Sequence, residues 1–328
     1  MKKIFITLVL ILSSCLSFNS AGAQDNDNIS RVVEASNQII FKQPERPVID
    51  SLISTLPTLT IDDAIAAVDS DMDERQITKI VDAIYLVNNL RNGNSLETSR
   101  DAISFTSLFP FRHPNSLDIA KLKDIFTSDS PTLHKTYLNK FPFVFRNCGP
   151  MIDIINLWDT IDANVAECEE KKATRALFDS YIPLIDGSKA PLATLYDKEG
   201  NTHSLSEYLG KTVVIDVWAT WCHNCLKKMP AMMELRDKYA EKGNVIFLTV
   251  SIDRRDKQAA WDKISEKYSL HGSHNLIVNS DEKSDFEESY KIFGIPRYIV
   301  IRPDGTLADA YAPGPGEDLK RLIDSTLK

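Results

Sequence analysis

Hydrophobic and polar positions follow two different rhythms along this chain. In residues 25–180 apolar residues recur at helical spacing, as Ile77, Ile80, Val81 and Ile84 do. Apolar residues at i, i+3, i+4 and i+7 lie on one side of an α-helix. This part of the chain therefore predicts a mostly α-helical domain.

Capping residues and prolines divide the helical part into shorter segments. Thr60 and Asp71 each precede acidic residues, as N-cap residues of helices do. We predict helices at 61–68, 77–90, 97–108, 115–127, 131–140 and 150–180. A break in the helical pattern at 183–191, around Asp186-Gly187-Ser188-Lys189, predicts a linker.

From about residue 190 strand-like and helix-like segments alternate. We predict strands at 193–196, 213–218, 245–252, 275–278, 297–302 and 306–311, and helices at 204–210, 223–240, 257–268, 284–293 and 317–327. The turn Pro303-Asp304-Gly305 joins the last two strands into a hairpin, which makes the sheet mixed. The pattern predicts an α/β domain with a mixed central sheet flanked by helices.

The N-terminus has the form of an export signal. Met1-Lys2-Lys3 is basic, and the apolar run Ile4–Leu12 is too short to span a bilayer. Ala21-Gly22-Ala23 fits cleavage by a signal peptidase, whereas Leu12-Ser13-Ser14-Cys15 resembles a lipobox that would leave Cys15 acylated. We predict a signal peptide at 1–23 and a periplasmic protein, either soluble or tethered through Cys15.

Length and charge narrow the possibilities further. A chain of 328 residues favours two domains, here 25–182 and 190–328. Its net charge of −8 argues against a nucleic-acid partner and against a polybasic membrane patch.

The chemistry of the chain is concentrated in a Cys-x-x-Cys motif, Cys222-His223-Asn224-Cys225, between a buried strand and a helix. The positive end of a helix dipole stabilises a thiolate. Cys222 is therefore expected to be the exposed nucleophile with a lowered pKa. Cys225, one turn further, is expected to be more buried and to resolve a mixed disulfide.

A zinc site and a purely structural disulfide are the other interpretations of this motif. Zinc needs a second pair of ligands, and Cys148 and Cys168 lie too far from each other in sequence to supply it. We predict no metal and no cofactor.

Cys148 and Cys168 leave a second disulfide open. If residues 148–168 form one unbroken helix, the two cysteines lie about 27–30 Å apart, at about 1.5 Å per residue, and cannot bond. A bridge requires a break near Asp159-Thr160. Without it, Cys168 is expected to be a small buried apolar residue.

Residues 190–328 resemble the thioredoxin-fold family, and within it the exported TlpA/ResA-like thiol–disulfide oxidoreductases. The motifs that carry this resemblance are Ser204–Lys211, Val214–Cys225, Pro230, Gly294-Ile295-Pro296 and Pro303-Asp304-Gly305. The resemblance implies a thioredoxin fold for this part and leaves the helical part unexplained.

The family match also implies roles for residues outside the two cysteines. Pro296 matches a cis-proline that faces the disulfide, so that Ile295 presents its backbone to a substrate chain. Asp216 matches a buried acid behind the second cysteine, with a raised pKa that suits it to take the proton from Cys225. Trp221 would shield the thiols. The other interpretations are a trans turn proline, a solvent-facing Asp216 and a surface tryptophan.

Two positions depart from the family pattern. Relatives often carry a glutamate where this chain has Lys228, so Asp216 is the expected acid–base group. His223 lies between the cysteines, where an imidazolium would stabilise the Cys222 thiolate and make the pair more oxidising.

The sequence thus predicts an exported thiol–disulfide oxidoreductase. It would reduce client proteins through Cys222 and Cys225 and be re-reduced by a membrane thiol donor. A thiol peroxidase is one alternative, although Ile215 and Ala219 stand where peroxiredoxins have Pro and Thr before the cysteine. The other alternative is a binding or scaffold protein whose helical domain recruits a partner.

Overall fold

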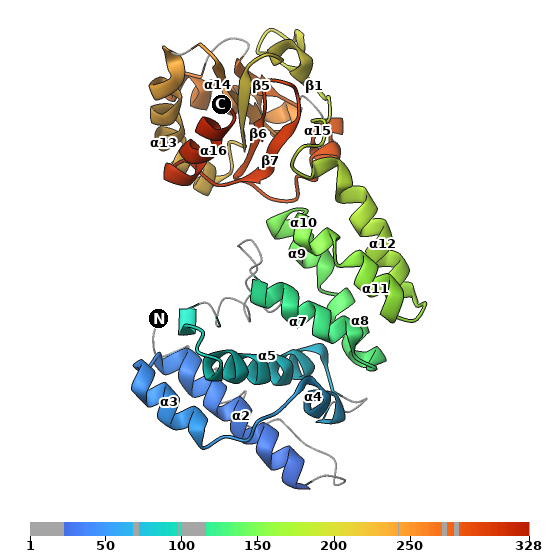
Figure 1. The fold of residues 1–328 in the computed structure, drawn as a ribbon. Coiled ribbons are helices and arrows are strands. Elements are labelled where there is room, and N and C mark those ends of the chain that lie inside the picture. The colour runs from blue at the N-terminus through green and yellow to red at the C-terminus, as the bar shows by residue number, and fades with distance from the viewer. Residues whose placement is uncertain are drawn as a thin grey trace. The chain divides into compact units, whose positions relative to one another are not determined.

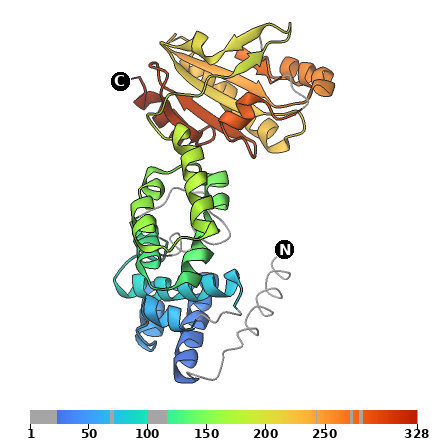
Figure 2. The same ribbon diagram turned by 90° about the vertical axis from the view of Figure 1, so that its right-hand side faces the viewer.

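The chain forms two compact units. The computed structural model describes residues 23–67, 72–97, 99, 116–241, 243–270, 274–278 and 282–327. The first unit comprises Met1–Phe145 and Met151–Leu177, and the second Arg146–Pro150 and Phe178–Lys328 (Figures 1 and 2). Nearly all of the predicted signal peptide with Cys15, the N-cap candidate Asp71 and most of the predicted helix 97–108 lie outside the described residues.

The N-terminal part of the chain is helical, as predicted. Its helices are α2 (Ala23–Lys42), α3 (Arg46–Ser54), α4 (Ile61–Ala67), α5 (Glu74–Arg91), α7 (Ser116–Thr127), α8 (Pro131–Leu138), α9 (Phe141–Cys148), α10 (Ile152–Ile155), α11 (Trp158–Asn164) and α12 (Glu169–Tyr181). None of the helices that the structure describes is both long and apolar enough to cross a membrane.

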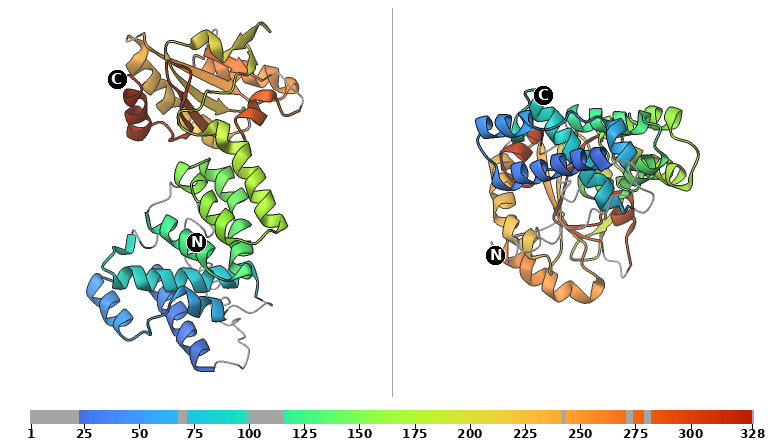
Figure 3. Two further views of the ribbon diagram at one scale, coloured as in Figure 1. Left: turned by 45° about the vertical axis from the view of Figure 1, so that its right-hand side comes forward. Right: turned by 90° about the horizontal axis from the view of Figure 1, so that it is seen from below.

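Helix α5 forms much of the core of the first unit. The four residues whose spacing predicted it are at most 2% exposed. Helices α2 and α3 pack beside it (Figure 3). Its N-cap is Asp73, whose carboxylate accepts from the backbone N–H of Arg75 and Gln76. Thr60 caps α4 as predicted, and its hydroxyl accepts from the N–H of Asp63.

The predicted helix 150–180 is wrong, because three shorter helices replace it. Between α10 and α11 the regular helix is interrupted at Asn156 and Leu157, which keep right-handed helical dihedral angles. Between α11 and α12 the chain leaves helical geometry at Val165, which is extended. At the second break the buried ammonium of Lys171, from α12, donates to the carbonyl oxygens of Asp162 and Val165. This side chain satisfies carbonyls at the C-terminal end of α11 that would otherwise lack partners.

The second unit is built on one seven-stranded mixed sheet. Its strands are β1 (Thr194–Tyr196), β2 (Thr202–Ser204), β3 (Thr212–Trp218), β4 (Val245–Ser251), β5 (Asn275–Ile277), β6 (Arg297–Ile301) and β7 (Leu307–Ala312). They lie in the order β2-β1-β5-β4-β3-β6-β7. β3 pairs in parallel with β4 and antiparallel with β6, so its residues are enclosed on both sides.

Helices cover the sheet, and their buried side chains form the core of the unit together with side chains of the strands. They are α13 (His223–Ala240), α14 (Gln258–Lys267), α15 (Asp285–Ser289), α16 (Glu317–Ser325) and the 3₁₀ helices Ile182–Leu184, Leu205–Tyr208 and Arg255–Lys257. Figure 1 shows α13, α14 and α16 beside the sheet. Side chains of these helices pack with Val214, Trp218 and Val300 in one buried cluster. The predicted α/β arrangement with a mixed sheet is confirmed.

The predicted linker 183–191 is instead paired to the sheet. The N–H of Gly187 donates to the carbonyl of Leu307, and the N–H of Leu307 donates to the carbonyl of Ser188. Lys189 forms a bridge with Thr306. These residues belong to the second unit and add to the edge of its hairpin.

Candidate functional site

Strand β3 carries the site, and all seven of its residues are buried. Alternate residues of a strand point to opposite faces of a sheet. Val214 and Trp218 belong to the cluster under α13, and Asp216 lies between them on the same face. The strand therefore directs one carboxyl group toward the helix that begins at the cysteine motif.

Cys222 and Cys225 form a disulfide, with Cα atoms 5.3 Å apart. Cys222 is the N-cap of α13, and its sulfur accepts a hydrogen bond from the backbone N–H of Cys225 at 3.1 Å. A helix N-terminus supplies unpaired N–H donors and a positive dipole end. The same donor is thus aimed at the sulfur that would become the thiolate on reduction.

Cys222 is the more accessible cysteine, as predicted, but it is not exposed. Its exposed fraction is 6% and that of Cys225 is 1%. Both belong to the core cluster, because the disulfide turns the Cys222 sulfur toward the helix. The neighbouring Trp221 is 65% exposed and lies at the surface, and His223 is exposed at the first position of α13.

Asp216 is 2% exposed, and its Oδ1 atom has no hydrogen-bond partner among the described residues. Burial in apolar surroundings disfavours the carboxylate and raises the pKa of Asp216 to about 7. Tyr298 stands opposite it on β6. Burial, with the charge of Asp216, raises the pKa of Tyr298 as well. The predicted solvent-facing alternative for Asp216 is thus wrong.

Lys228 lies close to this acid. Its ammonium is 5.9 Å from the centroid of the Tyr298 ring. The positive charge acts against burial and lowers the pKa of Asp216. Gly314 leaves room for the lysine, since a Cβ atom built there would lie 3.0 Å from the Lys228 Nζ.

The Ile295–Pro296 peptide bond is cis. Ile295 is partly buried against the same cluster that holds Cys222 and Cys225. The predicted cis-proline is present, and the trans alternative is wrong for the structure. Arg297 follows it directly.

Arg297 is a buried cation beside the cis-proline. Its Nη2 donates to the carbonyl oxygens of Tyr290 (3.3 Å) and Lys291 (3.1 Å). Its guanidinium lies 3.0 Å from the centroid of the Tyr311 ring. Burial lowers the pKa of Arg297 to about 10. The side chain joins the chain before the Pro296 loop to the strand after it.

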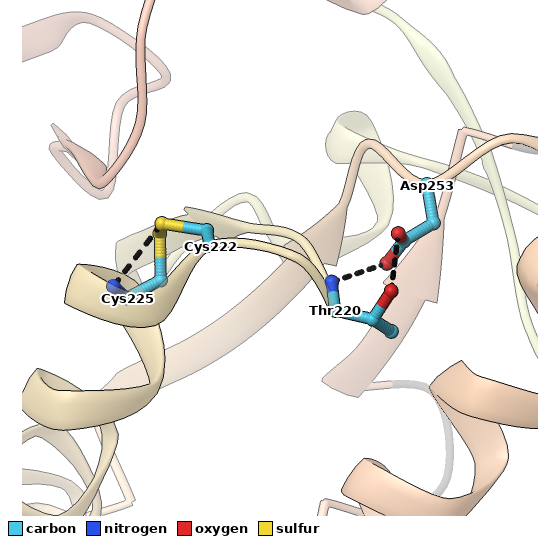
Figure 4. The surroundings of a disulfide bond; sticks show 4 residues. All are labelled: Thr220, Cys222, Cys225 and Asp253. Atoms are coloured by element: carbon cyan, nitrogen blue, oxygen red, sulfur yellow. Dashed lines mark hydrogen bonds between the residues drawn. A yellow bond between two sulfur atoms is a disulfide. The ribbon is translucent and has the colours of Figure 1, made fainter.

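Asp253 was not singled out by the sequence, although it lies beside the disulfide loop (Figure 4). Its Oδ2 accepts from the backbone N–H of Thr220 at 2.8 Å and its Oδ1 from the Thr220 hydroxyl at 2.7 Å. The Ser251 hydroxyl also donates to Oδ2, at 2.7 Å. An acid just after a strand parallel to β3 was the available signal, because parallel strands bring their carboxyl ends to one edge.

Cys148 and Cys168 do not form a disulfide. Cys148 is buried at the end of α9, and Cys168 is half-buried just before α12. The break predicted as the condition for a bridge lies elsewhere than Asp159-Thr160, which is inside α11. The expectation of a small buried Cys168 is also wrong, because its side chain is only half-buried.

Comparison with known proteins identifies relatives of the second unit. Residues 185–322 match the family model described as Redoxin. The chain is 30% identical over 142 residues to the thiol-disulfide oxidoreductase ResA of Bacillus thuringiensis subsp. konkukian, which covers 43% of this chain and 76% of the relative. It is 28% identical over 127 residues to the thioredoxin-like protein YneN of Bacillus subtilis, covering 38% and 71%.

Among solved structures, the chain is similar to the thioredoxin domain of a thiol-disulfide oxidoreductase from Bacteroides vulgatus. The sequence identity is 30%, and the match covers 44% of this chain and 99% of that domain, with a TM-score of 0.39.

Proposed function

Because the C-terminal part of this chain belongs to the ResA/TlpA-like thiol–disulfide oxidoreductases, we propose that the protein reduces disulfides of client proteins in the periplasm. The observation that carries this proposal is the disulfide at the N-terminus of α13, where the Cys225 N–H points at the Cys222 sulfur. A dithiol at this place can exchange electrons with another disulfide without any further cofactor.

The reaction begins with the reduced enzyme. The thiolate of Cys222 attacks one sulfur of a client disulfide, and the other client sulfur leaves as a thiolate. The Cys225 sulfur then attacks Cys222, and the second client sulfur leaves. The client gains two electrons and, at the pH of the compartment, two protons, while the enzyme is left with the Cys222–Cys225 disulfide.

Asp216 is the acid–base group of the resolving step. Cys225 must lose a proton before it attacks, and a carboxyl group with a pKa of about 7 can accept that proton near neutral pH. Its position on β3, on the face covered by α13, supports this role. Lys228 helps to keep the carboxyl ionised.

Ile295 and cis-Pro296 form the wall that receives the client chain. Backbone pairing at such a wall recognises an extended peptide rather than a particular sequence. The exposed ring of Trp221 beside the cysteines adds an apolar contact for the client. His223, exposed between the cysteines, adjusts the stability of the Cys222 thiolate.

The N-terminal sequence supports the proposed periplasmic location. The basic residues and short apolar run at 1–12 support export, and the protein is either soluble or held at the membrane by Cys15. Each turnover leaves the enzyme oxidised, so a membrane thiol donor re-reduces it.

Trapping of clients tests the proposal. Cys225→Ser removes the resolving sulfur, so mixed disulfides on Cys222 should accumulate. They should be recovered from periplasmic extracts and released by a thiol reductant. The double variant Cys222→Ser/Cys225→Ser is the matched control and should recover none. Absence of thiol-released proteins from the single variant would argue against a protein client.

The reduction potential decides the direction of electron flow. A value near about −270 mV fits a reductase, whereas one near about −120 mV fits an oxidase. Equilibration of the purified protein with glutathione buffers measures it. A value at the oxidising end would overturn the reductase proposal and leave the oxidoreductase chemistry intact.

A further inference from the structure

The loop between β3 and α13 decides where the attacking sulfur lies. Residues 219–221 connect Trp218 to Cys222. Two backbone hydrogen bonds anchor the two ends of this connection. The Ile252 N–H donates to the carbonyl of Trp218 at 2.9 Å, and the Cys222 N–H donates to the carbonyl of Ala219 at 3.0 Å.

The middle of the loop is held by one side chain, Asp253. It binds Thr220 through both carboxylate oxygens, one to the backbone N–H and one to the hydroxyl. Ser251 holds the carboxylate in turn, since its hydroxyl donates to Oδ2 and accepts from the Asp253 N–H. Ser251 stands opposite Trp218 in the parallel register of β3 and β4. Asp253, Ser251 and Thr220 thus form a clamp that ties the loop to the neighbouring strand β4.

Both oxygens of the Asp253 carboxylate accept hydrogen bonds. Asp253 has an exposed fraction of 0%. Its oxygens accept from three donors, which are the Thr220 N–H, the Thr220 hydroxyl and the Ser251 hydroxyl. Because both oxygens bind Thr220, they fix the orientation of that residue as well as its distance. Burial of a carboxylate is costly unless it is hydrogen-bonded in this way. A simple turn between strand and helix needs no such group.

We propose that Asp253 is a positioning residue for Cys222. By holding Thr220, two residues before the nucleophile, it fixes the direction from which the Cys222 sulfur approaches a disulfide. The inference rests on the proposed attack of Cys222 on a client. Attack on a disulfide requires the three sulfur atoms to be nearly in line, and a displacement of about 1 Å can cost about a hundredfold in rate.

Three substitutions test the clamp without touching the cysteines. Asp253→Asn keeps the size of the side chain but removes its charge. Its amide nitrogen cannot accept from the Thr220 hydroxyl, so that bond survives only with its direction reversed, and the charge-assisted hold on Thr220 is weakened. Thr220→Val removes only the hydroxyl bond and changes no charge. Thr220→Ser restores that hydroxyl. Tyr239→Phe is the matched control for stability, because it removes a hydrogen bond to Asp324 in the same unit, away from the loop.

The measurement is the rate constant of the reduced protein with a small aromatic disulfide, well below the unfolding midpoint of each variant. We expect Asp253→Asn to lower it about tenfold to a hundredfold and Thr220→Val about threefold to tenfold. Thr220→Ser should return it to within about twofold of the wild type, and Tyr239→Phe should leave it unchanged. The thiolate pKa of Cys222, followed by ultraviolet absorbance, should stay constant between Thr220→Val and Thr220→Ser.

Two outcomes would overturn the proposal. Unchanged rates in folded Asp253→Asn and Thr220→Val would mean that the clamp serves stability alone. A loss confined to Asp253→Asn would mean that charge, and not position, matters. If Asp253→Asn does not fold, the Thr220 pair still decides between these results.

The proposed reduction of client proteins and the positioning role of Asp253 can be contradicted independently of each other. A wild-type protein that reacts with the small disulfide and leaves insulin disulfides intact would contradict the proposed client reduction. The positioning of Cys222 would still be measured by the small disulfide.

Discussion

Among single residues, Asp216 shows how burial changes the pKa of a side chain. The side chain lies in an apolar cluster, and its Oδ1 atom has no hydrogen-bond partner among the described residues. A carboxyl group in this setting holds its proton more tightly in the folded protein than in the unfolded chain. This proton links the stability of the oxidised protein to pH.

The oxidised protein should lose stability as the pH rises. The pKa of Asp216 is about 7 in the folded protein and 3.8 in its ordinary state. The contribution is fully present below about pH 4 and is lost as the pH rises through about 7, at about 1.4 kcal/mol per pKa unit. The stability of Asp216→Asn relative to the wild type should therefore rise over this range, by on the order of 4 kcal/mol.

Denaturant unfolding of both oxidised proteins across this range measures the difference. Asp237→Asn is the matched control, because that carboxylate is exposed on α13. A difference between Asp216→Asn and the wild type that stays constant with pH would contradict the buried, proton-holding carboxyl.

Lys228 should set the pH at which the mixed disulfide is resolved. Its charge lowers the pKa of Asp216, so Lys228→Gln should raise that pKa. The resolving rate should then reach its plateau at higher pH, by about half a unit to one unit. Stopped-flow resolution of a preformed mixed disulfide gives the profile. Lys227→Gln, at the next exposed position, should leave the profile in place.

The sequence predicted those site residues that belong to a local sequence motif. Cys222, Cys225 and Pro296 stand in recognisable local patterns, and the structure joins the first two and finds the third in the cis form. Asp253 has no such pattern, because its partner Thr220 is 33 residues earlier in the chain. Exposure of Cys222 was also mispredicted, since a sulfur in a disulfide turns toward its partner.

At the scale of elements, the alternation of apolar segments located nearly every strand and helix of the second unit. Helix α13 has the predicted bounds, His223–Ala240. β2 was missed because Thr202–Ser204 is short and polar and depends on pairing with β1. The breaks between α10 and α12 were missed for a related reason. Periodicity does not reveal a side chain such as Lys171 that caps the end of the preceding helix.

Gly149 tests how the segment after α9 is packed. Its φ angle is +78°, and a Cβ atom there would lie 2.3 Å from Cδ2 of Tyr311. Gly149→Ala should therefore destabilise the protein by more than the about 1–2 kcal/mol of a left-handed conformation alone. Gly187→Ala is the matched control, since its φ is +85° with nothing within 4 Å of the added atom. Equal losses in urea unfolding would contradict the close packing on Tyr311.

For the whole molecule, the fold of the second unit could be predicted from the sequence, whereas that of the first could not. The second unit resembles a known family and carries its Cys-x-x-Cys motif, and the family has a known fold. The first unit was predicted only as helices, because helical periodicity reports which face is buried and not which helices pack together. The sequence also did not predict that Arg146–Pro150 belongs to the second unit, where Gly149 lies against Tyr311, far along the chain.

Truncation should separate chemistry from stability. A fragment of residues 185–328 keeps the cysteines, Asp216 and Pro296 but lacks the segment with Gly149. We expect its rate with a small disulfide to stay within about threefold of the full chain and its unfolding midpoint to fall by at least about 5 °C. A fragment of residues 146–328, which retains every residue of the second unit, should recover the midpoint.

The same fragments address the helical part of the chain. If 146–328 reduces insulin as the full chain does but rescues no phenotype of a deletion strain, the helical part recruits the client or another partner. A fragment 185–328 without any reactivity toward the small disulfide would contradict the assignment of the chemistry to the second unit.

The hydrogen bond from the Cys225 N–H to the Cys222 sulfur has a consequence for the cost of electron transfer. In the oxidised protein that donor already occupies the place where a thiolate would need it, 3.1 Å from the sulfur. Gain or loss of two electrons therefore demands little rearrangement of the helix end. The direction of exchange is then set by the difference in reduction potential between the Cys222/Cys225 pair and its partners.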